Sequence, residues 1–122
     1  MSKIIVVDDS ATMRQQVKQA LSPAGIDIVE AVDGQDGLNK VQADAAIDIM
    51  ILDVNMPRMN GIELAEALSK EGRVQQGLSI VMLTTEGHAD LIKRAKAAGA
   101  KGWIVKPFKP EMLLAAVQKM AK

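Results

Sequence analysis

The feature that most constrains this fold is a short apolar segment at residues 47–53, which reads Ile-Asp-Ile-Met-Ile-Leu-Asp. A nearly continuous apolar run bounded by turn residues is typical of a strand covered on both faces, as in a parallel sheet. The segment ends at Asp53, and a carboxylate at the end of a buried strand is costly to keep charged unless a cation or hydrogen-bond donors meet it. The sequence therefore predicts a buried strand that delivers Asp53 to a polar site.

Strand-like and helix-like segments alternate along the rest of the chain. Apolar residues at helical spacing follow each strand-like run, and four further strands are predicted at residues 4–7, 26–30, 78–83 and 102–105. In the second helix we expect Leu38, Val41 and Ala45 to form the buried face. Residues suited to the start of a helix are Ser10, Asp33 and Asn60 as N-caps and Pro110 as a first helical residue. This order predicts an α/β fold with a parallel five-stranded sheet between two layers of helices.

Composition narrows the classes of function. The chain has 122 residues, and its 15 basic and 15 acidic residues balance, so nothing predicts a nucleic-acid or anionic membrane partner. The absence of cysteine excludes disulfides, thiolate nucleophiles and thiolate metal ligands. No apolar run approaches the length of a membrane span. We therefore expect a single domain over residues 1–122 that is a cytoplasmic monomer.

Polar side chains follow four of the five predicted strands. Asp8 and Asp9 follow the first strand, and Asp53, Thr84 and Lys106 follow the third, fourth and fifth. Ligands of open parallel sheets bind at the carboxyl ends of the strands, so we expect these side chains to share a crevice. Three carboxylates there would repel one another by several kcal/mol at an effective dielectric of ~20, and a divalent cation removes that conflict. Ligands that are all oxygen atoms favour a hard ion, and a small, partly hydrated site fits Mg²⁺ better than Ca²⁺, which usually takes more protein ligands.

Lys106 and Thr84 add an anion-binding side to this predicted metal site. An ammonium and a hydroxyl that face a metal-bound carboxylate suit a phosphoryl group. Asp53 could then be the nucleophile that accepts phosphoryl as an acyl phosphate, and the backbone carbonyl of Asn55 could be a further metal ligand. Asp8-Asp9-Ser10 alone is more often a helix-capping cluster, so the joint placement of these residues carries the hypothesis.

Taken together, these motifs resemble the receiver domain of two-component response regulators. The matching motifs, in order and spacing, are Asp8-Asp9, Asp53-Val54-Asn55-Met56-Pro57, Asn60-Gly61, Thr84 and Lys106-Pro107-Phe108. Residues 10–14 are similar to the stand-alone chemotaxis regulators of that family. The resemblance implies a flavodoxin-like (βα)5 fold with strand order 2-1-3-4-5 and a single receiver domain without an output domain.

The resemblance also implies a function and a set of roles. Asp53 would take phosphoryl from a histidine kinase, and Thr84 and Lys106 would bind the phosphoryl oxygens. Mg²⁺ would be held by Asp8, Asp9, Asp53 and the backbone carbonyl of Asn55. Such a protein is a signalling phosphoacceptor rather than an enzyme, and it catalyses only its own phosphorylation and dephosphorylation.

Further positions follow from the resemblance. Asn55 and Glu86 occupy the two positions that tune dephosphorylation. Trp103 stands where the family carries a switch aromatic that moves with Thr84, although Tyr or Phe is usual there. The signalling face would be the fourth helix, fifth strand and fifth helix, roughly residues 87–122, and it would bind a downstream protein such as a flagellar motor switch.

Two alternative functions use similar chemistry. A phosphate sink or relay would need the same pocket, so the residues do not separate it from a binding switch. A Mg²⁺-dependent phosphatase with an aspartate nucleophile usually carries a second Asp two residues later as general acid. Here that position is Asn55, and the nucleophile follows the third strand rather than the first, so the sequence favours the receiver-domain interpretation.

Overall fold

The computed structural model describes residues 3–54, 59–85 and 89–120 of the chain. Strands and helices alternate, and their bounds are β1 (Lys3–Val7), α1 (Ala11–Leu21), β2 (Asp27–Ala31), α2 (Gly34–Ala43), β3 (Ile49–Leu52), α3 (Gly61–Lys70), β4 (Ser79–Thr84), α4 (Ala89–Ala97), β5 (Ala100–Val105) and α5 (Pro110–Met120), with a 3₁₀ turn at Ser22–Ala24. The strands form one sheet in the order β2-β1-β3-β4-β5, and all four pairings are parallel. The α/β class and the strand order are confirmed.

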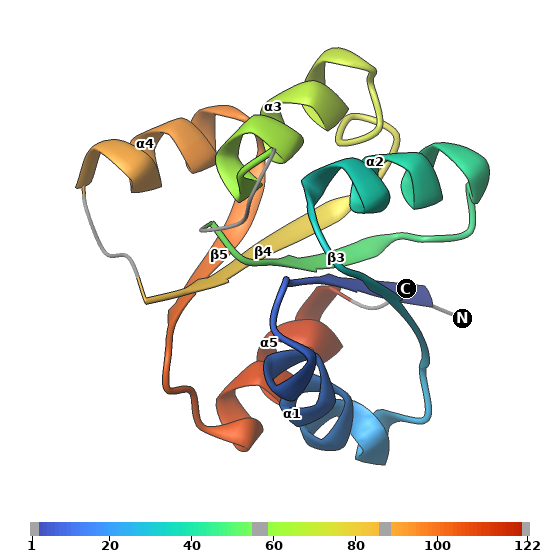
Figure 1. Ribbon diagram of the computed structural model, residues 1–122, viewed down its shortest axis with the longest axis vertical. Coiled ribbons are helices and arrows are strands. Elements are labelled where there is room, and N and C mark those ends of the chain that lie inside the picture. Colours follow the sequence, from blue (N-terminus) through green and yellow to red (C-terminus); the bar gives the residue numbers. More distant parts are fainter. Residues whose placement is uncertain (1–2, 55–58, 86–88, 121–122) are drawn as a thin grey trace.

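The sheet lies between two layers of helices (Figure 1). Helices α1 and α5 cover one face, and α2, α3 and α4 cover the other. The side chains of β3 alternate between the two cores, since Met50 and Leu52 pack with α2, α3 and α4 while Ile49 and Ile51 pack with α1 and α5. This double burial explains why the central strand reads as an unbroken apolar run.

The predicted bounds of every strand differ from the observed ones by one or two residues, and the end of the second helix is also wrong. Strand β3 spans Ile49–Leu52 rather than residues 47–53, and Ala45 is exposed beyond the end of α2 instead of facing the core. The cause is Asp44, which adopts an extended conformation and accepts a hydrogen bond from the Ala46 N–H at 3.0 Å. An Asp side chain that accepts a hydrogen bond from a nearby backbone N–H offers the backbone an alternative to the helical hydrogen bonds, which favours the end of the helix there.

The predicted helix starts are confirmed. Ser10, Asp33 and Asn60 are N-caps whose side chains accept from the backbone N–H three residues later. Glu63 completes a capping box with Asn60, and α5 begins at Pro110. Within the described part of the chain, no helix combines the length and the apolar character needed to cross a bilayer.

Candidate functional site

The residues that the sequence predicts to be functional, those at the strand ends, meet at one edge of the sheet. Asp8 and Asp53 directly follow β1 and β3, and Lys106 directly follows β5. Thr84 is the last residue of β4 rather than the residue after it, and it is fully buried. Hydrogen bonds between neighbouring strands continue into the site, because Asp53 N–H donates to the Val7 carbonyl at 3.0 Å and Lys106 N–H donates to the Thr84 carbonyl at 2.9 Å.

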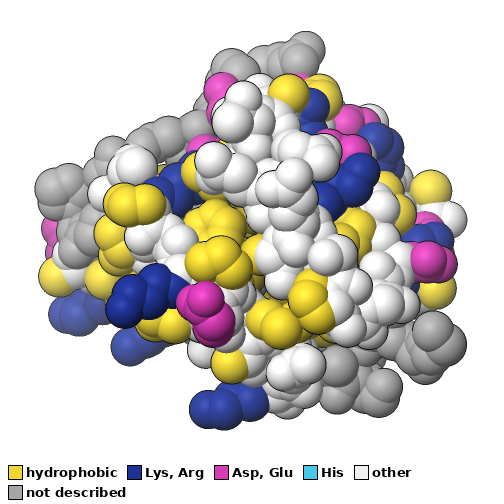
Figure 2. Space-filling view, turned by 90° about the horizontal axis from the view of Figure 1, so that it is seen from below, with side chains coloured by type: hydrophobic (Ala, Val, Ile, Leu, Met, Phe, Trp, Pro, Cys, Tyr) yellow, Lys and Arg dark blue, Asp and Glu magenta, His cyan; other side chains and the backbone are white. Residues whose placement is uncertain are grey.

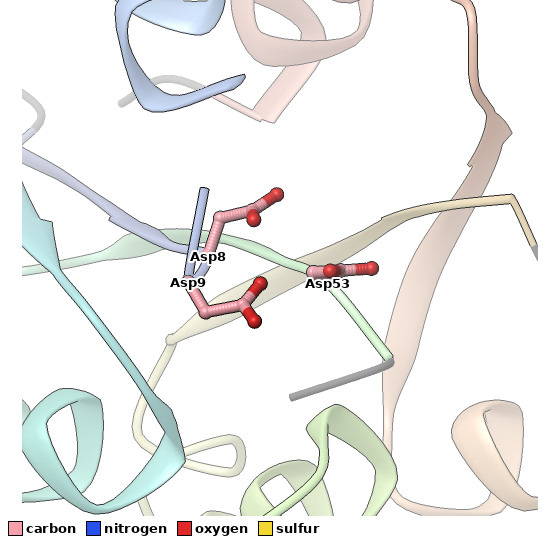
Figure 3. A group of neighbouring side chains, drawn as sticks. All are labelled: Asp8, Asp9 and Asp53. Atoms are coloured by element: carbon pink, nitrogen blue, oxygen red, sulfur yellow. The ribbon is translucent and has the colours of Figure 1, made fainter. Parts of the chain in front are cut away.

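Three carboxylates gather there. Asp8, Asp9 and Asp53 each offer an oxygen atom, and these atoms lie within 4.8 Å of one another. Figure 3 shows the three side chains side by side, Asp8 and Asp9 beyond the end of β1 and Asp53 beyond the end of β3. Asp8 and Asp53 are only 3% and 7% exposed, whereas Asp9 is exposed. Two of the carboxylates are thus largely removed from water, and the third faces solvent.

Lys106 supplies the balancing charge. Its Nζ atom lies 3.0 Å from Asp8 Oδ2 and 3.6 Å from Asp53 Oδ2, and its side chain is 13% exposed. One ammonium facing three carboxylates leaves the group with a negative surplus. Mg²⁺ binds oxygen ligands, and carboxylates with surplus negative charge attract a cation. These residues therefore fit that ion.

Asp8 is held from several directions. Its Oδ1 accepts from the Ser10 N–H at 2.9 Å, and its Oδ2 accepts from Lys106. Its own N–H donates to the Ala31 carbonyl of β2 at 3.1 Å. Because both carboxylate oxygens have protein donors, the orientation of this side chain is determined before any ligand arrives.

Gly61 positions the backbone of Asp53, a role that sequence reasoning missed. The glycine is the first residue of α3, its N–H donates to the Val54 carbonyl at 2.9 Å, and a Cβ on it would overlap the carbonyl of Asp53. Only glycine allows the start of α3 to approach so closely. The Asn60-Gly61 pair was the available signal, although it does not say which backbone the glycine contacts.

Arg14 is the second residue that was missed. Its guanidinium donates to the Asp8 carbonyl at 2.7 Å and to Glu30 Oε1 at 3.0 Å. The hydrogen bond from Arg14 is the main cause that lowers the pKa of the Glu30 carboxyl below its ordinary value. A hydrogen bond from Lys18 lowers this pKa further. An arginine in the first turn of a helix carries no sequence signal for the carbonyl that it will reach.

Trp103 lies on β5 beside α4. It is partly buried and packs against the core on the α2, α3 and α4 side of the sheet. Its strand neighbour is Met82, and Thr84 pairs with Val105 two residues further on. Both remaining predicted site residues, Asn55 and Glu86, lie outside the described residues, as does the first part of the expected signalling face.

An apolar groove adjoins the acidic group. It has a volume of about 630 Å³ between α1 and the connection from β5 to α5, and Lys106 belongs to both the groove and the acidic group. Its walls include Met13, Ala20, Pro107 and Phe108. Figure 2 views the molecule from the side of α1 and α5, where apolar side chains gather in the middle of the face and charged ones surround them.

Comparison with known proteins agrees with this geometry. Residues 4–118 match the family described as "Response regulator receiver domain". The chain is 41% identical over 112 residues to the chemotaxis protein CheY1 of Helicobacter pylori, covering 91% of this chain and 90% of that protein. It is 32% identical to CheY of Thermotoga maritima, covering 98% of both. The solved structure of CheY4 from Vibrio cholerae superposes with a TM-score of 0.88 at 41% identity, covering 99% of each chain.

Proposed function

Because the chain belongs to the family of response regulator receiver domains, we propose that Asp53 accepts a phosphoryl group from a histidine kinase and thereby switches binding to a partner protein. Family membership of the CheY type implies chemotaxis two-component signalling, and proteins of this type are signalling proteins rather than conventional enzymes. One observation carries the proposal. Carboxylates far apart in sequence converge beside Lys106, whose Nζ lies 3.0 Å from Asp8 and 3.6 Å from Asp53.

The transfer step follows from the charges around Asp53. A carboxylate oxygen of Asp53 attacks phosphorus, a P–O bond forms, and the P–N bond of the donor phosphohistidine breaks with its electron pair left on the imidazole. Lys106 stabilises the phosphoryl oxygens by charge, and the Thr84 hydroxyl at the end of β4 donates to them. Mg²⁺, when bound, would supply positive charge that offsets the negative charge of the phosphoryl group. Residues proposed to hold the ion are Asp8, Asp9, Asp53 and the backbone carbonyl of Asn55.

The output of the switch would pass through β5. Trp103 and Thr84 lie on neighbouring strands, and Trp103 packs beside α4 in a partly buried position. We propose that phosphoryl bound at Asp53 draws the Thr84 hydroxyl toward it and changes the packing of Trp103, a two-state change driven by a local charge. The partner would then bind the surface of α4, β5 and α5. Asn55 and Glu86 are proposed to tune the rate of dephosphorylation.

The first prediction concerns Asp53. Incubation with acetyl phosphate and Mg²⁺ should add one phosphoryl group to the wild-type protein and change the emission of Trp103, and Asp53→Asn should abolish both effects because the nucleophile is lost. Intact-mass spectrometry and fluorescence measure the two outcomes. Asp90→Asn, on the exposed first turn of α4, is the matched control and should keep both. Equal labelling of Asp53→Asn would contradict the assignment.

Switch and phosphate sink differ in the lifetime of the phosphorylated protein. We expect a partner to be retained in a pulldown with beryllofluoride as the phosphoryl mimic, and we expect the phosphoryl group on Asp53 to persist long enough for that partner to bind. Return of the label from Asp53 to the kinase before any partner binds would instead identify a sink or relay. Measuring both on one preparation separates the two functions.

A further inference from the structure

Arg14 joins the acidic loop after β1 to the edge strand β2. From the first turn of α1, its Nη1 donates to the Asp8 carbonyl at 2.7 Å and its Nε donates to Glu30 Oε1 at 3.0 Å. The Arg14 side chain is 13% exposed, so water competes weakly for these bonds. The guanidinium fork suits this task, because it offers donors in a fixed geometry to two acceptors at once.

The Asp8 carbonyl, which accepts the hydrogen bond from Arg14, belongs to the peptide group between Asp8 and Asp9. Asp8 is already fixed by the Ser10 N–H, the Ala31 carbonyl and Lys106, whereas Asp9 is exposed at the rim of the site. A change in the ψ angle of Asp8, which the Arg14 hydrogen bond to the Asp8 carbonyl restrains, would move Asp9 and its carboxylate relative to those of Asp8 and Asp53. Holding that peptide therefore holds the third oxygen donor in place.

We propose that Arg14 is a positioning residue for the cation site, which it supports by fixing the peptide between Asp8 and Asp9. The inference rests on the proposed function, since that function requires a divalent cation at Asp8, Asp9 and Asp53. A guanidinium near a cation site also repels the cation, so charge and positioning predict opposite effects when Arg14 is replaced. The sign of the change in affinity therefore separates the two roles.

The test measures Mg²⁺ affinity by calorimetry and Mn²⁺ affinity by electron paramagnetic resonance, neither of which depends on phosphoryl transfer. Arg14→Ala should weaken binding of both ions on the order of tenfold, the lower end of what outer-shell partners of metal ligands contribute. Lys18→Ala is the matched control. Lys18 lies on the same helix, carries the same charge and contacts the same Glu30 carboxylate at 3.3 Å, whereas the hydrogen bond to the Asp8 carbonyl comes from Arg14. Removal of Lys18 should therefore leave ion affinity unchanged.

Arg14→Lys keeps the charge but lacks the fork, and it should also weaken ion binding. It carries the test if Arg14→Ala does not fold, as judged by thermal unfolding in the presence of a chelator. Unchanged or tighter binding in the folded Arg14 variants, or equal weakening by Lys18→Ala, would overturn the positioning role. Failure of the wild-type protein to bind either ion would instead overturn the proposed metal site itself.

Discussion

Asp8 and Asp9 are neighbours in the sequence, but their side chains lie in different surroundings, and we expect them to contribute differently to stability and to ion binding. The Asp8 carboxylate is buried, bonded through both oxygens, and paired with a Lys106 that is itself mostly buried. Asp9 is exposed, and its carboxylate approaches those of Asp8 and Asp53. Removing one partner of a largely buried ion pair leaves an uncompensated charge, whereas removing an exposed carboxylate from a group of like charges relieves repulsion.

A pair of substitutions tests this division of roles. We expect Asp9→Ala to weaken Mg²⁺ binding about tenfold or more while changing the free energy of unfolding in chelator by less than about 0.5 kcal/mol. Asp8→Ala should weaken Mg²⁺ binding and also destabilise the fold by about 1–3 kcal/mol, because it removes the acceptor of Ser10 and Lys106. Titration calorimetry and urea unfolding measure the two quantities. Unchanged Mg²⁺ affinity of Asp9→Ala would remove Asp9 from the proposed metal ligands.

At the scale of elements, α2 shows packing overriding intrinsic helix propensity. Two of its first four residues are glycines, which are poor helix formers. A Cβ on Gly34 would overlap the backbone of Met59, just before α3, and a Cβ on Gly37 would lie 3.0 Å from a methyl group of Val7 and 3.3 Å from one of Leu64. The glycines let α2 approach both the sheet and the segment that leads into α3.

Alanine in place of either Gly34 or Gly37 should therefore destabilise the protein, although alanine favours isolated helices. Gly34→Ala is expected to cost about 1–3 kcal/mol, because it meets a backbone that cannot rotate away. Gly37→Ala should cost less, since side chains can give by a few tenths of an ångström. Gln35→Ala, on the exposed side of the same helix, should stay within about 0.5 kcal/mol of wild type. Urea unfolding ranks the three, and a stabilised Gly34→Ala would contradict the overlap.

At the scale of the whole molecule, ion pairs link the elements around the outside of the sheet. Arg14 and Lys18 of α1 pair with Glu30 of β2, Arg94 of α4 pairs with Glu66 of α3, and Lys3 of β1 pairs with Asp44 after α2. The Lys3 hydrogen bond lowers the pKa of the Asp44 carboxyl, and the Ala46 N–H adds to the effect. The same pair raises the pKa of Lys3.

These shifts predict how stability responds to acid. A carboxyl whose pKa is lower in the folded state stabilises the fold above its unfolded pKa, about 3.9 for Asp, and loses that contribution as pH falls through the folded value. The difference in unfolding free energy between wild type and Asp44→Asn should thus be largest above about pH 5 and shrink toward zero in stronger acid. Lys3→Gln should flatten the same part of the profile. A difference that grows on acidification would contradict the predicted direction.

Local chemistry was readable from the sequence. The apolar run before Asp53 indicated a strand buried on both faces, Ser10, Asp33 and Asn60 indicated helix starts, and the alternation of segments indicated the α/β class. Each of these signals arises within a few residues, where side-chain size and backbone hydrogen bonding act directly. The convergence of Asp8, Asp9, Asp53 and Lys106 was predictable because the carboxyl ends of parallel strands lie at a common edge of the sheet, so residues after different strands come together there.

Contacts between elements were decided only by the tertiary structure. No local pattern predicts that Arg14 donates to the Asp8 carbonyl. Nor does any local pattern predict the close approach of Gly34 to the backbone of Met59 or of Gly61 to the carbonyl of Asp53. The end of α2 before Ala45 likewise depends in part on Asp44 meeting Lys3 of another element. The physical reason is the distance over which the interactions act. Interactions within a few residues determine which element each segment forms, whereas close contacts between segments depend on how the assembled layers pack.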